Sequence, residues 1–158
     1  MSDRKVKIIN MSNATVTLAF MNSNFKRVLR GEGAYLDVPF NILYDGLSEP
    51  GTDIMFTKGY LSIPDKKDRI DLGLEYEDDT QGLENITMSS KSMLELLKEG
   101  NAVKIKSALE ELAPAQQKKM AEVAIQNGIY SPGVAAIINK YTGIDLAAAI
   151  ADKEEVSE

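Results

Sequence analysis

The chain lacks three residue types on which much protein chemistry depends. It has no histidine, no cysteine and no tryptophan among its 158 residues. Without histidine there is no Ser–His–Asp or Cys–His nucleophile pair and no imidazole to shuttle protons near neutral pH. Without cysteine there is no disulfide, no thiolate nucleophile, and no zinc-finger or iron–sulfur ligation. These absences favour recognition without catalysis, and we expect that the chain is not an enzyme.

Long hydrophobic runs are also missing. Residues 1–7 carry charges, but no apolar core of signal-peptide length follows them. No apolar run reaches the roughly 20 residues that cross a membrane. The pattern predicts a soluble chain with no membrane partner and no export by a signal peptide. The lack of cysteine fits a reducing compartment, or a protein that needs no disulfides.

The remaining composition is that of an ordinary folded protein. The chain is 44% hydrophobic and 27% charged, with 11 glycines and 5 prolines. A chain of this length buries about 69% of its unfolded surface on folding. That burial is enough for one self-sufficient core or for two small ones.

The net charge of −6 is distributed unevenly. Residues 1–30 hold six cations against one carboxylate, a net +5, whereas residues 31–88 hold four cations against thirteen carboxylates, a net −9. Residues 89–158 hold eight cations and ten carboxylates. A basic region beside an acidic one can bind a complementary copy of the chain or another charged partner. The alternative is neutralisation within one molecule, or ordinary solvated faces.

Residues 1–73 predict a β-rich module. β-branched and alternating residues separated by turn residues are typical of strands. Such segments occupy residues 6–10, 15–20, 25–30, 34–38 and 60–63. Short helices are expected at residues 39–47, 53–59 and 65–72. We expect the first four strands to follow one another in meander order, in an antiparallel, barrel-like sheet or small sandwich with one wet face.

An acidic linker at 74–88 and a bundle of short helices at 89–152 complete an α+β chain. Beyond the linker, apolar residues recur at helical spacing, and capping residues and glycines divide them into separate helices. These helices are expected at about 90–100, 101–112, 114–127, 132–142 and 146–152. The polar end, 153–158, is expected to fray.

One group of carboxylates could bind a cation. Its members are Glu75, Glu77, Asp78, Asp79 and Glu84. Hard cations need several oxygens at one point, but the ligand order and central glycine of an EF-hand are missing, so a solvated linker is favoured. Gly31 and Gly33 lack the third glycine of a dinucleotide fingerprint and predict a hairpin turn. The sequence therefore nominates no catalytic, cofactor-binding or metal-binding residue.

Basic residues in the predicted strands are the candidates for partner binding. They are Arg4, Lys5, Lys7, Lys26, Arg27 and Arg30. One candidate partner is a protein of complementary charge, and the other is a nucleic acid, for which Phe20 or Phe25 can supply stacking. The ten aromatic residues and the absence of a basic recognition helix disfavour the nucleic acid. Alanines in 146–151 predict close helix packing, either in the core or at a subunit contact.

Five segments carry a resemblance to a known group of proteins. They are KIINMSNA (7–14), FKRVL (25–29), LYDGL (43–47), IMFTKGYLSI (54–63) and KYTGID (140–145). The chain resembles small proteins encoded among the structural genes of tailed bacteriophages and prophages. The resemblance implies a virion or assembly role without assigning any functional residue.

The role implied by the resemblance is that of a non-catalytic accessory protein on the capsid or connector. It would bind a larger phage structural protein, with a homo-oligomer as a further option, and would be found in the virion and, during assembly, in the host cytoplasm. The alternative is a small regulatory protein that binds nucleic acid through the same basic strands.

Overall fold

A computed structural model describes residues 4–77, 83 and 86–156. The chain divides into two compact units, Met1–Thr87 and Met88–Glu158. Each unit has its own cluster of buried apolar side chains. Strands and three short helices make up the described part of the first unit, and helices make up that of the second. The α+β class expected from the sequence is therefore confirmed.

The strands of the first unit form two antiparallel sheets. β1 (Lys5–Asn10) lies between β4 (Tyr35–Pro39) and β5 (Leu61–Ser62) in the order β4-β1-β5, and β2 (Thr15–Phe20) pairs with β3 (Phe25–Arg30) in a separate hairpin. The five predicted strands are present, but the predicted meander order is wrong, because β1 pairs with β4 and β5 rather than with β2.

The buried side chain of Asn10 gives the physical reason for this pairing. Its Nδ2 donates to the carbonyl oxygens of Ala14 at 2.7 Å and Leu29 at 3.1 Å. Its Oδ1 accepts from the N–H of Ser12 at 2.9 Å and from the Ser12 hydroxyl at 2.8 Å. These bonds stabilise a corner that carries the chain from one sheet to the other, in place of the simple turn that the sequence predicted.

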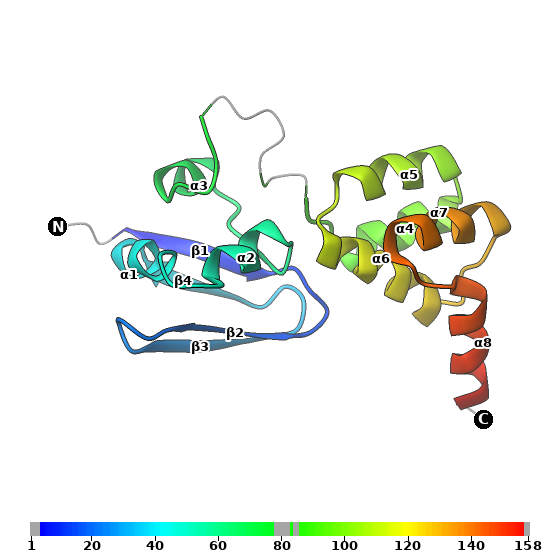
Figure 1. The fold of residues 1–158 in the computed structure, drawn as a ribbon, viewed down its shortest axis with the longest axis horizontal. Helices are drawn as coiled ribbons and strands as arrows, with labels where there is room; N and C mark the ends of the chain where they lie inside the picture. Colours follow the sequence, from blue (N-terminus) through cyan, green and yellow to red (C-terminus); the bar gives the residue numbers. More distant parts are fainter. Residues whose placement is uncertain (1–3, 78–82, 84–85, 157–158) are drawn as a thin grey trace. The chain divides into compact units, whose positions relative to one another are not determined.

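One core lies between the two sheets and the short helices. Alternation along the strands directs Val6 and Ile8 of β1 inward, together with Leu18 and Phe20 of β2, and all four are buried. The helices are α1 (Phe40–Gly46), α2 (Thr52–Thr57) and α3 (Lys66–Asp71). They and their flanking residues add Leu43, Phe56 and Leu72 to the same core. The β2–β3 hairpin forms its own layer beside the other sheet (Figure 1).

The start of the predicted acidic linker belongs to the core of the first unit. Glu75 is buried, and its Oε1 accepts from Arg69 Nε at 3.2 Å and from the Leu83 N–H at 2.8 Å. Arg69 is buried too, and its Nη1 donates to the carbonyl oxygens of Ile63 at 2.7 Å and Pro64 at 3.0 Å. A solvated position for Glu75 is therefore wrong, because a buried guanidinium compensates its charge.

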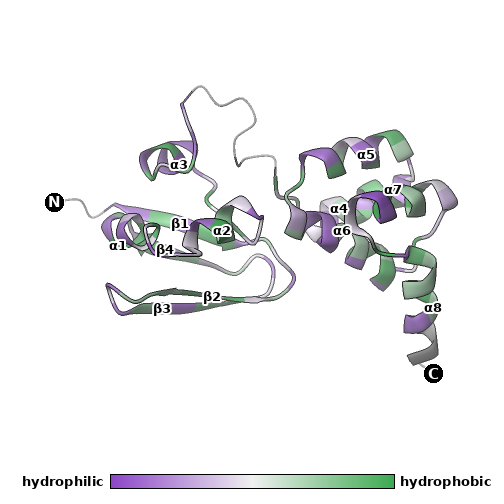
Figure 2. Cartoon of the chain, viewed as in Figure 1, coloured by the Kyte–Doolittle hydropathy of each residue, from purple (hydrophilic) through white to green (hydrophobic). Residues whose placement is uncertain are grey.

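The second unit consists of five helices within the described residues. They are α4 (Ser90–Glu99), α5 (Ala102–Glu111), α6 (Pro114–Gln126), α7 (Pro132–Thr142) and α8 (Leu146–Val156). Both hydrophobic and hydrophilic residues occur along α5, α6 and α7 (Figure 2), as expected for amphipathic helices that pack on one core.

Local signals in the sequence agree with these helix ends. The side chains of Ser89, Asn101 and Ser131 accept hydrogen bonds from the first turns of α4, α5 and α7. The helix α8 differs, because it continues to Val156 rather than ending near Asp152. Lys153 explains part of the extension, since its Nζ donates to the Gln126 carbonyl at the end of α6 at 2.6 Å.

Candidate functional site

The six cations predicted as one partner-binding surface lie in different settings, and Arg4 is used within the molecule. Arg4 Nε donates to Asp68 Oδ1 at 3.1 Å, its Nη2 donates to the same oxygen, and its Nη1 donates to Asp71 Oδ2 at 2.9 Å. The guanidinium also lies 4.5 Å from the centre of the Phe40 ring. The hydrogen bonds to Asp68 and then to Asp71 raise the pKa of Arg4. Arg4 is therefore neutralised within the molecule, which is the alternative to partner binding given above.

Lys5 and Lys7 lie on the solvent face of the three-stranded sheet. Both alternate with buried residues of β1 and are exposed. Lys7 is paired in register with Asp37 of β4, and its Nζ lies 4.5 Å from the centre of the Tyr35 ring. The charge of Lys7 therefore faces both a carboxylate and an aromatic ring on its own sheet.

The other three cations lie on β3. Two of them, Lys26 and Arg30, belong to a solvent-exposed face of the β2–β3 hairpin. Six side chains point outward from this face and all are exposed, a group that we call the hairpin face. They are Thr15, Thr17, Ala19, Lys26, Val28 and Arg30. It contains two cations and no carboxylate, and Val28, 42% exposed, lies between the cations on the same strand. Among the residues that the structure describes, neither Lys26 nor Arg30 has an ion pair.

Arg27 lies on the opposite face of the hairpin, in register with the buried Leu18. Its guanidinium is nevertheless exposed, lies 4.8 Å from the centre of the Phe25 ring, and donates from Nη1 to the Lys26 carbonyl at 2.8 Å. Lys26, Arg27 and Arg30 thus lie on one strand, separate from Lys5 and Lys7 on a different sheet and from Arg4, which precedes that sheet's strand β1.

Of the two phenylalanines considered for base stacking, Phe20 is buried and Phe25 is partly covered. Phe20 is 2% exposed and lies so close to α1 that a Cβ on Gly46 would be 2.5 Å from its ring. Phe25 is half-buried, stacks on Phe20 with 5.5 Å between ring centres, and has Arg27 over its ring. Stacking by Phe20 is therefore wrong, because alternation and the hairpin pairing direct Phe20 into the core.

Two tyrosines that the sequence did not nominate lie on the three-stranded sheet. Tyr35 is 61% exposed and is directly opposite Ile9 in the register. Tyr60, 43% exposed, precedes β5, whose Ser62 pairs with Ile9 on the other side. We call Lys7, Ile9, Tyr35 and Tyr60 the tyrosine face. Strand alternation directs Tyr35 away from the core, and the strand order β4-β1-β5 places Tyr60, which precedes β5, beside β1.

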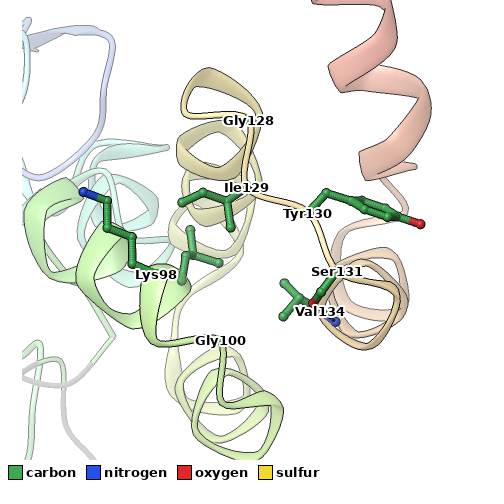
Figure 3. Close-up of a pocket in the computed structure, with 8 residues that line it drawn as sticks. Lys98, Gly100, Gly128, Ile129, Tyr130, Ser131 and Val134 are labelled. Atoms are coloured by element: carbon green, nitrogen blue, oxygen red, sulfur yellow. Dashed lines mark hydrogen bonds between the residues drawn. The ribbon is translucent and has the colours of Figure 1, made fainter.

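The second unit has a pocket of about 460 Å³ between the end of α4 and the α6–α7 connection (Figure 3). Its apolar lining comes from Leu97, Ile129 and Val134, and its one charged residue is Lys98. Figure 3 shows that the Lys98 amino group points away from Tyr130 on the other rim. The polar groups do not converge on one point as they do in a typical small-molecule site.

The part of the chain that the structure describes holds no candidate metal cluster and no single helix with the character of a membrane span. No group of three or more acidic side chains is positioned to hold a metal ion there, while Asp78, Asp79 and Glu84 of the predicted acidic group lie outside those residues. No single helix there has the length and apolar composition of a membrane span, and α7 and α8 meet that criterion only as a pair bent by 101°.

Comparisons with known proteins add no relative to these observations. No protein-family model matches the chain, and no curated protein or solved structure is significantly similar to it.

Proposed function

We propose that the chain is a non-catalytic structural protein of tailed-phage particles, an accessory component that docks through its first unit on a larger capsid or connector protein. The resemblance of the sequence to products of phage structural genes supports the phage setting. The docking role is supported by one observation above all, the hairpin face. Its exposed cations have no carboxylate beside them on that face, so a partner surface with carboxylates is the complementary one.

The size of the hairpin face determines what kind of docking is reasonable. Strands of six residues are about 20 Å long, and two of them are about 10 Å wide, which gives roughly 200 Å². A stable protein complex buries about 800 Å² on each partner. One hairpin face therefore gives a weak contact that depends on ionic strength, and it becomes effective when many copies bind a symmetric array.

Purified particles provide the test. We expect the chain in them at a copy number that matches a set of symmetry-related sites, measured by quantitative mass spectrometry. The double variant Lys26→Glu with Arg30→Glu should lower this occupancy strongly. The control Lys91→Glu with Lys106→Glu changes the net charge equally at exposed positions of the second unit and should keep it. Absence of the chain from particles, or equal occupancy of both variants, would contradict the proposal.

The tyrosine face favours a second candidate, a regulatory protein that binds single-stranded nucleic acid. Exposed aromatic rings and lysines on an open sheet are what base stacking and phosphate contacts require. Asp37 counts against it, because this carboxylate lies opposite Lys7 and repels phosphate. Fluorescence anisotropy with a labelled oligonucleotide tests the candidate. It requires binding that weakens steeply with salt and is lost in Tyr35→Ala with Tyr60→Ala.

A further inference from the structure

We propose that the free edge of β3 is a strand-addition site that takes an extended, acidic segment of a partner protein. The inference rests on the proposed docking function and specifies its mode: a partner strand pairs with β3 through main-chain hydrogen bonds, while its carboxylates contact the β3 cations. This mode of recognition combines backbone pairing for affinity with alternate side chains for specificity.

The geometry of the hairpin provides the edge. Within the described part of the chain, β3 pairs with β2 alone, in a continuous register of six residue pairs, from Thr15 with Arg30 to Phe20 with Phe25. In an antiparallel pair every second residue directs its N–H and C=O away from the partner strand, so among the described residues these groups of β3 have no second strand. β3 also contains no proline, which would remove a donor from the edge.

A hydrogen bond on β3 agrees with an unpaired edge. The Lys26 carbonyl accepts from the guanidinium of the adjacent Arg27 at 2.8 Å. The turn that follows β2 has another partner, because the carboxylate of Glu49 accepts from the N–H groups of Met21 at 2.8 Å and Asn22 at 3.4 Å. All the charged residues of the two hairpin strands lie on β3, so β3 is the strand whose edge we assign to an acidic partner.

Exposure on both faces of β3 leaves room for the side chains of an added strand. Lys26 and Val28 are exposed on the hairpin face, and Arg27 is exposed on the opposite face. An added strand also has side chains on both faces, and each one lies about 5 Å from its cross-strand neighbour. Neither face of this part of β3 needs to open before a strand can pair with it.

The cations determine which strand is accepted. Charged residues on an edge strand normally prevent association with other strands. All the charged residues of β3 are positive. They attract acidic strands and repel basic ones, so specificity comes from the repulsion of wrong partners as well as from the attraction of the right one. Lys26, Val28 and Arg30 alternate on one face, so the preferred ligand reads acidic–x–apolar–x–acidic along its own strand.

Synthetic peptides and the full chain test the mode directly. The probe is the acetylated and amidated peptide Thr-Glu-Thr-Val-Thr-Glu-Thr, and the charge control has Lys in place of Glu. Binding is followed by fluorescence anisotropy and by NMR shifts of residues 25–30. We expect the acidic peptide alone to bind. Lys26→Glu with Arg30→Glu should weaken binding at least about tenfold, because each attraction becomes a repulsion. Lys91→Glu with Lys106→Glu should leave it unchanged.

N-methylation of the peptide separates strand addition from simple charge attraction. Two versions of the acidic peptide carry N-methyl groups on the odd or on the even residues. In an added strand only one set of N–H groups faces β3, so one version should bind about as well as the parent and the other at least about tenfold more weakly. Equal binding of the two N-methylated versions overturns strand addition. The docking function can still stand in that case, if Lys26→Glu with Arg30→Glu lowers the occupancy of the chain in particles.

A different result is expected if the cations of β3 serve only to prevent its edge from associating with other strands. The variant Lys26→Thr with Arg30→Thr would then self-associate in sedimentation velocity, and no acidic peptide would bind to the unmodified chain. That pair of results overturns the inference. Binding of the acidic peptide with the expected N-methyl dependence supports it, whether or not the chain is found in particles.

Discussion

Replacing Glu75 should destabilise the first unit through the buried charge left on Arg69. Both side chains are almost inaccessible, with 1% of Glu75 and 3% of Arg69 exposed. Removing one partner of a buried ion pair costs about 3–5 kcal/mol, because the remaining charge has no compensation. Glu75→Ala should therefore lower the free energy of unfolding by about 4 kcal/mol, a large share of the 5–15 kcal/mol typical of a domain.

The contacts of the pair predict an order among further variants. Glu75→Gln also leaves the charge of Arg69 without a countercharge, but it keeps an oxygen that accepts from Arg69 Nε and the Leu83 N–H, so it should cost less than the about 4 kcal/mol of Glu75→Ala. Arg69→Met with Glu75→Leu removes both charges but leaves the carbonyls of Ile63 and Pro64 without their Arg69 donor. That double variant should be more stable than Glu75→Ala and less stable than the unmodified chain.

Native-state hydrogen exchange measures these effects for each unit. Amides of β1 and β4 should lose protection in Glu75→Ala by the factor that corresponds to about 4 kcal/mol, while amides of α6 and α7 serve as the internal control. The control is valid because the two units have separate cores. A loss below about 1 kcal/mol, the value of an exposed pair, would refute the burial argument.

Three further predictions concern other contacts. Asn10→Ala should lower the stability of the first unit by about 3 kcal/mol in urea unfolding, because the buried carbonyl of Leu29 loses a donor; an unchanged midpoint would contradict the corner assignment. Lys153→Ala should increase hydrogen exchange at the end of α8 while α7 stays protected, and the reverse pattern would exclude the contact with Gln126. Burial, and then the hydrogen bond to Glu110, raises the pKa of Tyr141 above its ordinary 10.0. The contribution of Tyr141 to folding stability is therefore complete below pH 10.0 and is lost as the pH rises through the pKa of the folded state. Tyr141→Phe should remove that loss from alkaline unfolding curves of the second unit.

Predictions from the sequence succeeded where the information was local. Alternation in 34–38 placed Tyr35 outward and Val38 inward, and the structure agrees. Capping residues such as Asn101 and Ser131 placed helix starts correctly, because a cap bonds to N–H groups only two or three residues away. These features need no knowledge of distant segments.

Predictions failed where a contact depends on how the chain folds and not on the local sequence pattern. Glu75 looked like one of several solvated carboxylates, and its burial depends on Arg69, which α3 places beside it. The meander order failed because Asn10 forms bonds across the corner to Leu29, nineteen residues away. Five of the six cations lie in strands, whereas Arg4 precedes β1, and strand pairing decided that the five lie on two sheets.

The sequence by itself therefore determined the α+β class, the strand and helix segments, and an N-terminal region rich in cations without histidine or cysteine chemistry. The tertiary structure alone decided which of those cations remain open to a partner. Arg4 is engaged by Asp68 and Asp71, whereas Lys26 and Arg30 lie on an exposed face without a carboxylate. The physical reason is that a charge is neutralised by what lies within a few ångströms of it in space, and sequence position does not specify those neighbours.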